Sequence, residues 1–380
     1  MFKKKLSLLS IPVFIGVFLL FFIEFSFVSS LAGKSKNQKD YKLLGKAISL
    51  IKNEYIEEPN PFKTLEGAFK SMVDSLDVLS AYLEEPLRKK YISLPSTAFK
   101  EPGLIIYKKY GSYPQIIGIR ENSPAAGKDL KIGDFISAID EQSTLTMSMQ
   151  EVHLLMKDES DKPIRLKVLK PTKTEDITLD RKHPVDELYS YLPLEKTYGI
   201  LRIHQLFSPC AARIEEELRQ RITVQNMPLI LDLRNCIEGK DDVAVRLVNL
   251  FLQEDKIGYF SNRNGPTQYL SCPDEPEFAD VPLIIWTNRA TFGPAEIAAA
   301  VLQESKRAKV IGLKTSGLTA RQNLFVLDDG SGLLLTTQIF HLQSGEPVWQ
   351  KGVQPDVKMS SGDLTSDAYV EKTYNLIRDM

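Results

Sequence analysis

The second half of the chain alternates short apolar runs with amphipathic stretches, and this order restricts its fold more than any other feature. The apolar runs have the length of buried strands and are Gly199–Ile203, Leu229–Leu233, Leu283–Thr287 and Lys309–Ile311. The stretches between them have helical spacing and are Ala211–Ile222, Val243–Leu252 and Pro294–Gln303. This order predicts an α/β layer with a mostly parallel sheet, whose ligands bind where strands end and helices begin.

Two smaller regions precede this layer. Residues 99–182 hold short β-rich runs and one helical stretch, Ser148–Lys157, which predict a small, partly open barrel. The β-rich runs are Leu104–Tyr107, Ile116–Ile119, Phe135–Ile139, Ile164–Leu169 and Ile177–Leu179. Residues 40–98 carry apolar residues at helical spacing and predict a helical arm, in which residues 79–94 form an amphipathic helix. With 380 residues, the chain is long enough for these parts and a core domain at residues 183–365.

Residues 1–32 have the features of an export segment. Three lysines, Lys3 to Lys5, precede Leu6–Ile23, a run of 18 residues without a charge. Such a start is typical of a signal peptide or of a single membrane anchor, and Ser30 to Ala32 offers small residues for cleavage. We therefore expect the remaining chain to lie outside the cytoplasm, in the periplasm or at the cell surface, either anchored to the membrane or released.

Composition excludes several classes of function. A net charge of −1 provides no general field for nucleic acid. The three cysteines are scattered and the four histidines lack close spacing, so we expect neither a metal nor another cofactor. Cys236, directly after a predicted strand, fits a nucleophile or a small buried residue.

Polar residues after the strands are the candidates for chemistry. Thr291 follows one strand and fits either a nucleophile or a helix cap. The candidate bases are Lys306, Lys314 and His204, and spacing alone selects none of them.

Five stretches, in the same order, resemble motifs of the C-terminal processing (tail-specific) serine peptidases. They match the family's SLDPHSxYL, the PDZ signature SPAxxAGLxxGDxI, LDLRN, the SEI helix start and GxxPD. Here they read Ser75–Leu83, Asn122–Ala126 with Ile132–Ile136, Leu231–Asn235, Glu296-Ile297 and Gly352–Asp356. The resemblance implies a crotonase-like peptidase core, a PDZ domain at residues 99–182 and a helical N-terminal arm.

The same resemblance locates a Ser–Lys catalytic dyad at positions that have changed. Gly293 stands where the family has its serine, and Leu318 stands where it has its lysine, while the matching Gln322 is retained. The family's oxyanion loop corresponds to residues that include Glu238 and Gly239, and Glu238 replaces a glycine. Gly293 has no side chain that a substrate could acylate, and Leu318 can neither accept nor donate a proton. The Glu238 carboxylate would repel the negative charge that develops on the substrate oxygen in the transition state. The resemblance therefore implies a pseudopeptidase.

The PDZ part implies binding of protein C-terminal tails, which add as a strand beside the domain's second strand. The residues expected to bind the peptide are Gly103, Leu104, Ile105 and Ile106 in the loop and strand, and Met149, Val152, His153 and Met156 on the facing helix. Val152 and Met156 fit the barrel core equally well. An apolar groove predicts a preference for apolar tails.

Two functions therefore remain open. One is a membrane-attached, non-catalytic binder of protein tails. The other is an active processing endopeptidase that uses Thr291 and Lys314 in relocated roles. Self-association into a homo-oligomer, or assembly with an active paralogue, is compatible with either.

Overall fold

The computed structural model describes residues 35–57, 61–93, 99–183, 188–194, 198–222, 228–360 and 365–379. The predicted export segment lies outside these residues. The chain divides between Ala68 and Phe69 into two compact units, and the features discussed below belong to the second. The first contains α2 (Ser35–Glu54) and the start of α3 (Pro61–Asp74). Among the described residues, no helix has the length and apolarity to cross a membrane.

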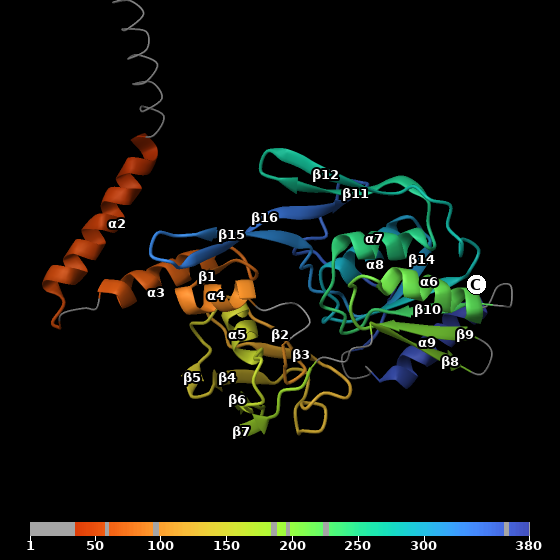
Figure 1. Cartoon of the computed structure of the whole chain (residues 1–380), viewed down its shortest axis with the longest axis horizontal. Helices are drawn as coiled ribbons and strands as arrows, with labels where there is room; N and C mark the ends of the chain where they lie inside the picture. Colours follow the sequence, from red (N-terminus) through yellow and green to blue (C-terminus); the bar gives the residue numbers. More distant parts are fainter. Residues whose placement is uncertain are drawn as a thin grey trace, which may run out of the picture. The chain divides into compact units, whose positions relative to one another are not determined.

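The core of the second unit is the predicted parallel layer (Figure 1). Its sheet has the order β17-β14-β13-β10-β9-β8, and every pairing is parallel except that of β8 with β9. The strands are β8 (Tyr189–Leu194), β9 (Tyr198–Ile203), β10 (Leu229–Asp232), β13 (Leu283–Thr287), β14 (Ala308–Gly312) and β17 (Val357–Lys358). The central strands β10 and β13 are buried along their whole length, as expected for strands covered on both faces.

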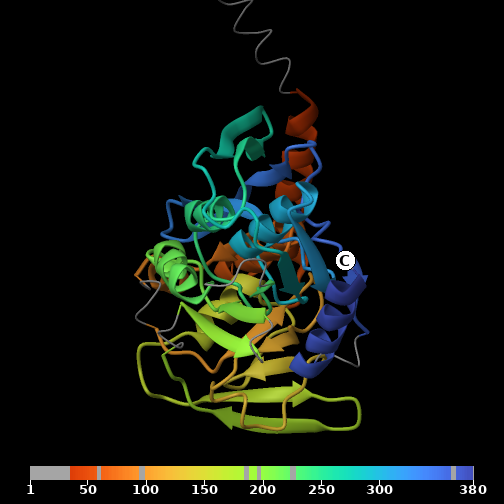
Figure 2. The same ribbon diagram turned by 90° about the vertical axis from the view of Figure 1, so that its right-hand side faces the viewer.

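Helices cover both faces of this sheet. Side chains of α6 (Cys210–Arg221), α7 (Asp241–Asn249) and α8 (Pro294–Glu304) share one large apolar cluster with the sheet. On the opposite face, α9 (Ser366–Asp379) packs Tyr369 against Trp286 with ring centroids 5.3 Å apart. Figures 1 and 2 show α6 to α8 on one side of the strands and α9 on the other. The predicted α/β class is confirmed.

A second, antiparallel sheet lies beside the core and was not predicted. Its order is β1-β16-β11-β12, and β15 also pairs with β16. The strands are β1 (Ala81–Leu83), β11 (Glu254–Asn262), β12 (Gly265–Cys272), β15 (Ala320–Val326) and β16 (Gly332–Leu342). The strand β1 corrects the expected helix over residues 79–94, since helix α4 (Glu85–Ser93) begins only after it. A local turn at Asp77 explains why the expected helix does not start at residue 79. The Asp77 carboxylate accepts the backbone N–H groups of Leu79 and Ser80 at 2.8 Å, which takes them out of helical hydrogen bonding.

The region of residues 99–182, which the sequence predicts to be a small, partly open barrel, contains one antiparallel sheet of short strands and one helix, and we call it the small barrel below. Its sheet has the order β2-β3-β4-β6-β7, with β5 paired to β4, and β2 is an end strand. The strands are β2 (Leu104–Tyr107), β3 (Gln115–Ile119), β4 (Phe135–Ile139), β5 (Gln142–Ser143), β6 (Ile164–Leu169) and β7 (Thr174–Leu179). One helix, α5 (Met149–Met156), starts at a capping box between Ser148 and Glu151. The small barrel packs beside the core, and the two share an apolar cluster.

Candidate active site

Both dyad positions line one cleft between the small barrel and the core. Gly293 ends the loop after β13 and is the N-cap of α8, while Leu318 lies between β14 and β15. The cleft has a volume of about 340 Å³. Residues from the small barrel line it too, including Leu104 of β2 and Met149 of α5. A ligand of this cleft would therefore touch both domains.

Gly293 leaves room for a side chain that it does not have. Its backbone has φ 50° and ψ −116°, a conformation that favours glycine. Apart from its two chain neighbours, the nearest atom to a Cβ built on this residue is the carbonyl oxygen of Leu318, at 3.7 Å. Steric exclusion therefore does not explain the missing nucleophile.

Leu318 turns its half of the site into an apolar surface. It is 7% exposed and belongs to the buried cluster that contains Phe292 and Leu104. Neither neighbour can donate or accept a side-chain proton, so this side of the cleft contains no general base at the lysine's position.

Glu296 joins the loops of the two dyad positions. Its buried carboxylate accepts the N–H groups of Gly317 (2.6 Å), Leu318 (2.7 Å) and Gly293 (3.2 Å). Burial raises its pKa to about 7, against the lowering effect of these bonds and of the Thr315 hydroxyl. The sequence shows Glu296 only as part of a motif, and in the structure it is the N3 residue of α8, whose carboxylate accepts the N–H of the N-cap Gly293. Its contact with the loop of Leu318 is a tertiary one that no local pattern reveals.

Thr291 and Lys314 do not form a catalytic pair in this structure. Thr291 is completely buried, and its hydroxyl donates to the carbonyl of Leu233 at 2.9 Å and accepts the N–H of Asn288 at 3.1 Å. Lys314 is exposed, and no hydrogen bond joins it to Thr291 among the described residues. Thr291 closes the turn after β13 and does not cap α8, whose N-cap is Gly293.

Cys236 is also buried, and burial raises the pKa of its thiol, which disfavours the reactive thiolate. The small-buried-residue interpretation fits these observations.

At the position of the expected oxyanion loop, Glu238 joins the core to the small barrel, whereas Gly239 contacts another segment of the core. The Glu238 carboxylate is 2.8 Å from Lys157 Nζ and 3.6 Å from Arg120 Nη2. Burial alone would raise the pKa of Glu238, but Lys157 and Arg120 outweigh it and lower the pKa. Gly239 pairs with Leu206, and a Cβ on it would lie 2.8 Å from the Leu206 carbonyl oxygen. Its lack of a side chain therefore permits this close approach.

The expected peptide-binding residues separate into two groups. Leu104, Met149, His153 and Met156 line the cleft. Ile105, Ile106 and Val152 are completely buried inside the small barrel, so for Val152 the core alternative holds. Met156 is buried in the same cluster and also lines the cleft, so both interpretations apply to it. Gly103 has φ 84°, and a Cβ on it would meet the Ser123 Cβ at 2.1 Å, so only glycine fits this loop.

Gln322, which the resemblance associates with the catalytic lysine, here makes a structural hydrogen bond next to the second sheet. Its side-chain amide donates to the backbone carbonyl of Leu79, next to the start of β1. Asp77 further joins this segment to β16 by accepting the Thr336 hydroxyl at 3.1 Å. The stretch Ser75–Leu83 therefore supports one wall of the cleft, which Leu79 also lines.

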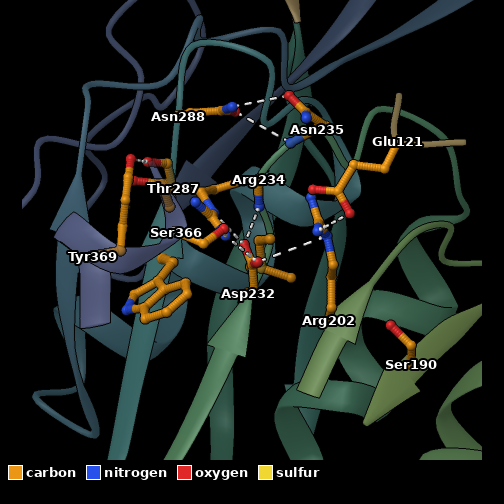
Figure 3. Close-up of polar contacts among 12 residues, drawn as sticks. Glu121, Ser190, Arg202, Asp232, Arg234, Asn235, Thr287, Asn288, Ser366 and Tyr369 are labelled. Atoms are coloured by element: carbon orange, nitrogen blue, oxygen red, sulfur yellow. Dashed lines mark hydrogen bonds and ion pairs between the residues drawn. The ribbon is translucent and has the colours of Figure 1, made fainter. Parts of the chain in front are cut away.

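The LDLRN stretch braces the ends of the parallel strands (Figure 3). Asp232 accepts two hydrogen bonds from the Arg234 guanidinium, at 2.8 and 2.7 Å. That guanidinium also lies over the rings of Trp286 and Tyr369, 4.8 and 4.4 Å from their centroids. The side chain of Asn235 donates to the carbonyl of Ile119 in β3, which adds a polar contact between core and small barrel. The role of this motif here is structural support.

Comparisons with known proteins agree with this architecture. Residues 197–359 match the model of peptidase family S41. The chain is 28% identical over 354 residues to the carboxy-terminal processing protease CtpA of Bacillus subtilis, covering 91% of this chain and 75% of that protein. It is 27% identical over 318 residues to a carboxyl-terminal-processing protease of Picosynechococcus, covering 81% and 76%.

A solved structure shares the fold. A photosystem II D1 C-terminal processing protease aligns with a TM-score of 0.68 at 21% identity, covering 85% of this chain and 94% of that one. The chain is therefore similar over most of its length to C-terminal processing proteases, and its residues 197–359 match peptidase family S41.

Proposed function

We propose that this chain binds the C-terminal tails of other proteins and does not cleave them. The observation that carries the proposal is the pair Gly293 and Leu318 in one cleft with the small barrel. Peptide hydrolysis by this family's chemistry needs a nucleophile and a base within hydrogen-bond reach. Gly293 has no side chain and Leu318 has an apolar one, so these two positions provide neither the nucleophile nor the base that acyl transfer requires.

The small barrel acts, in this proposal, as a PDZ-type module. Its strand β2 is the end strand of its sheet and has β3 as its partner, which leaves one edge for an added strand. Leu104 from β2 and Met149 and Met156 from α5 offer apolar contacts in the cleft. These side chains favour a tail that ends in an apolar residue.

The test is a binding titration combined with a cleavage assay on the full chain in mild detergent. The probes are fluorescein-labelled decapeptides that end in Ala, Val, Leu or Phe, each with a free or an amidated C-terminus. We expect at least one free tail to bind about tenfold more tightly than its amidated form, because its carboxylate is recognised. We also expect mass spectrometry to find every peptide uncut. Equal affinity for both forms would contradict tail recognition, and cleavage lost on Thr291→Ala would favour the active endopeptidase.

A matched pair of variants tests the loop before β2. Gly103→Ala should abolish tail binding, because a Cβ there collides with Ser123 and displaces the loop. Gly111→Ala is the control, since Gly111 also has a positive φ of 68° but has no atom within 4 Å of an added Cβ. It should retain binding, and equal losses in both variants would contradict the role of the loop.

We further propose that the module works outside the cytoplasm, on the basis of the basic and apolar sequence of residues 1–32. A fusion of residues 1–40 to alkaline phosphatase, which is active only after export, should be active in bacterial cells. An inactive fusion that still carries Lys3, Lys4 and Lys5 would contradict export.

A further inference from the structure

Four charged side chains meet where the small barrel contacts the core. Glu101, Arg120 and Lys157 come from the small barrel, and Glu238 comes from the core; we call them the charge cluster. Arg120 Nε lies 2.9 Å from a Glu101 carboxylate oxygen, and Lys157 Nζ lies 2.8 Å from Glu238. Each of these side chains is at most 24% exposed. The cluster therefore contains two cations and two carboxylates in a largely dehydrated place.

The charge cluster lies at one defined end of the groove between β2 and α5. Lys157 is the C-cap of α5, and the next residue, Asp158, forms a backbone bridge with Lys100. Lys100 directly precedes the loop that leads into β2. The backbone N–H of Arg120 donates to the carbonyl of Gly103 in that loop, at 2.8 Å. Both cations are therefore fixed beside the loop before the first residue of β2.

This is the end at which a bound tail would terminate. A peptide that adds to β2 as an antiparallel strand runs in the opposite direction, so its C-terminus lies next to the start of β2. Lys157 and Glu238 line the same cleft as Leu104. The tail's carboxylate and the Glu238 carboxylate would thus require the same cations.

We propose that Lys157 and Arg120 form the subsite for the tail's carboxylate, and that Glu238 occupies this subsite as an internal competitor when no tail is bound. The inference rests on the proposed function. Glu238 stands at a position where the resemblance expects glycine, so the competitor is a feature of this chain's own sequence.

Charge balance explains why the two carboxylates exclude each other. The cluster is neutral with Glu238 present, and a tail would add a third carboxylate to two cations. Dehydrated like charges repel strongly, and an uncompensated buried carboxylate is costly. Glu101 keeps Arg120 as its partner at 2.9 Å, whereas Glu238 comes from a loop of the core, between β10 and α7. Glu238 is therefore the group that leaves when the tail arrives.

The experiment measures tail affinity in the full chain with charge-neutral variants. The probe is the free-carboxylate decapeptide that binds the unmodified chain most tightly, together with its amidated form. Glu238→Gln should raise the affinity for the free tail about tenfold and leave the affinity for the amidated peptide unchanged. Lys157→Gln should lower the affinity for the free tail about tenfold, to the level of the amidated peptide. The control is Glu121→Gln, which removes a 61% exposed carboxylate paired with Arg202 outside the charge cluster and should change neither affinity.

The outcomes separate the two proposals. If the unmodified chain binds no free tail in preference to its amidated form, the proposed function fails and this inference fails with it. If free tails bind but a folded Glu238→Gln gains nothing, only the competitor is overturned. If Glu238→Gln does not fold, hydrogen exchange on the unmodified chain decides. A saturating free tail should speed exchange of the Leu206 amide, which donates to the Glu238 carbonyl at 2.9 Å, and unchanged exchange would overturn the inference.

Discussion

The double variant Gly293→Ser/Leu318→Lys is expected to gain serine peptidase activity. The cleft has room for a side chain on residue 293, since the nearest atom to its Cβ, apart from the two chain neighbours, is 3.7 Å away. A lysine at residue 318 would start from a largely buried, apolar position, which lowers the pKa of an amine and makes it a better base near neutral pH. The backbone at residue 293 has the positive φ of 50°, so a serine there is strained by about 1–2 kcal/mol but tolerable.

The gain depends on both changes together, because a nucleophile without its base is weakly reactive. We expect the double variant to cleave an unstructured, apolar-tailed protein at least about 100-fold faster than Gly293→Ala/Leu318→Lys, the matched control. A further Glu238→Gly change should increase the rate again by removing a carboxylate near the developing oxyanion. Mass spectrometry with a fluorophosphonate reagent would locate the acylated residue. A folded double variant that forms no adduct would show that more than the dyad separates this site from activity.

The variant Glu296→Ala is expected to cost about 3–5 kcal/mol of unfolding free energy. It leaves the N–H groups of Gly293, Gly317 and Leu318 without their acceptor in a buried place, and each such loss costs about 1–3 kcal/mol. Urea denaturation followed by circular dichroism measures the change. The matched control is Glu304→Ala near the other end of α8, where the carboxylate accepts only exposed N–H groups, and it should cost less than about 1 kcal/mol.

Glu296 should also make stability depend on pH in an unusual direction. Its pKa is about 7 in the folded chain and near the ordinary 4.5 when unfolded, so between these values the folded state holds the extra proton. Its contribution is fully present below about pH 4.5 and is lost as the pH rises through about 7, by up to about 3 kcal/mol. Glu296→Gln should remove this slope from the denaturation midpoints. An unchanged slope in that variant would contradict the assignment.

The sequence predicts strands well where burial is continuous or alternates cleanly. The runs Leu104–Tyr107, Phe135–Ile139 and Ile164–Leu169 agree with β2, β4 and β6 because apolar side chains there directly report the buried face. The parallel layer follows for the same reason. The antiparallel sheet was missed because its strands carry a weaker signal. Four consecutive residues of β12, from Pro266 to Tyr269, are exposed, so no apolar period marks the strand.

In the site, too, the sequence predicts the features that local motifs encode and misses the contacts between distant residues. Identities at residues 293 and 318 can be read from motifs, because those motifs have a fixed spacing. The partners of Glu238 cannot, since Lys157 is 81 positions away in the chain and belongs to another domain. The same holds for Glu296, whose acceptor role toward Gly317 spans 21 positions. Long-range hydrogen bonds and ion pairs leave no periodic trace in one sequence.

The short strand β1 has a consequence for how this protein reaches its native state. It pairs with β16, and the neighbouring Ser80 accepts the backbone N–H of Thr336, 256 positions further along. A ribosome has therefore made most of the polypeptide before β1 can find its partner, and closing so long a loop is slow. The early part of the chain therefore stays structurally incomplete during synthesis, until β16 has been made.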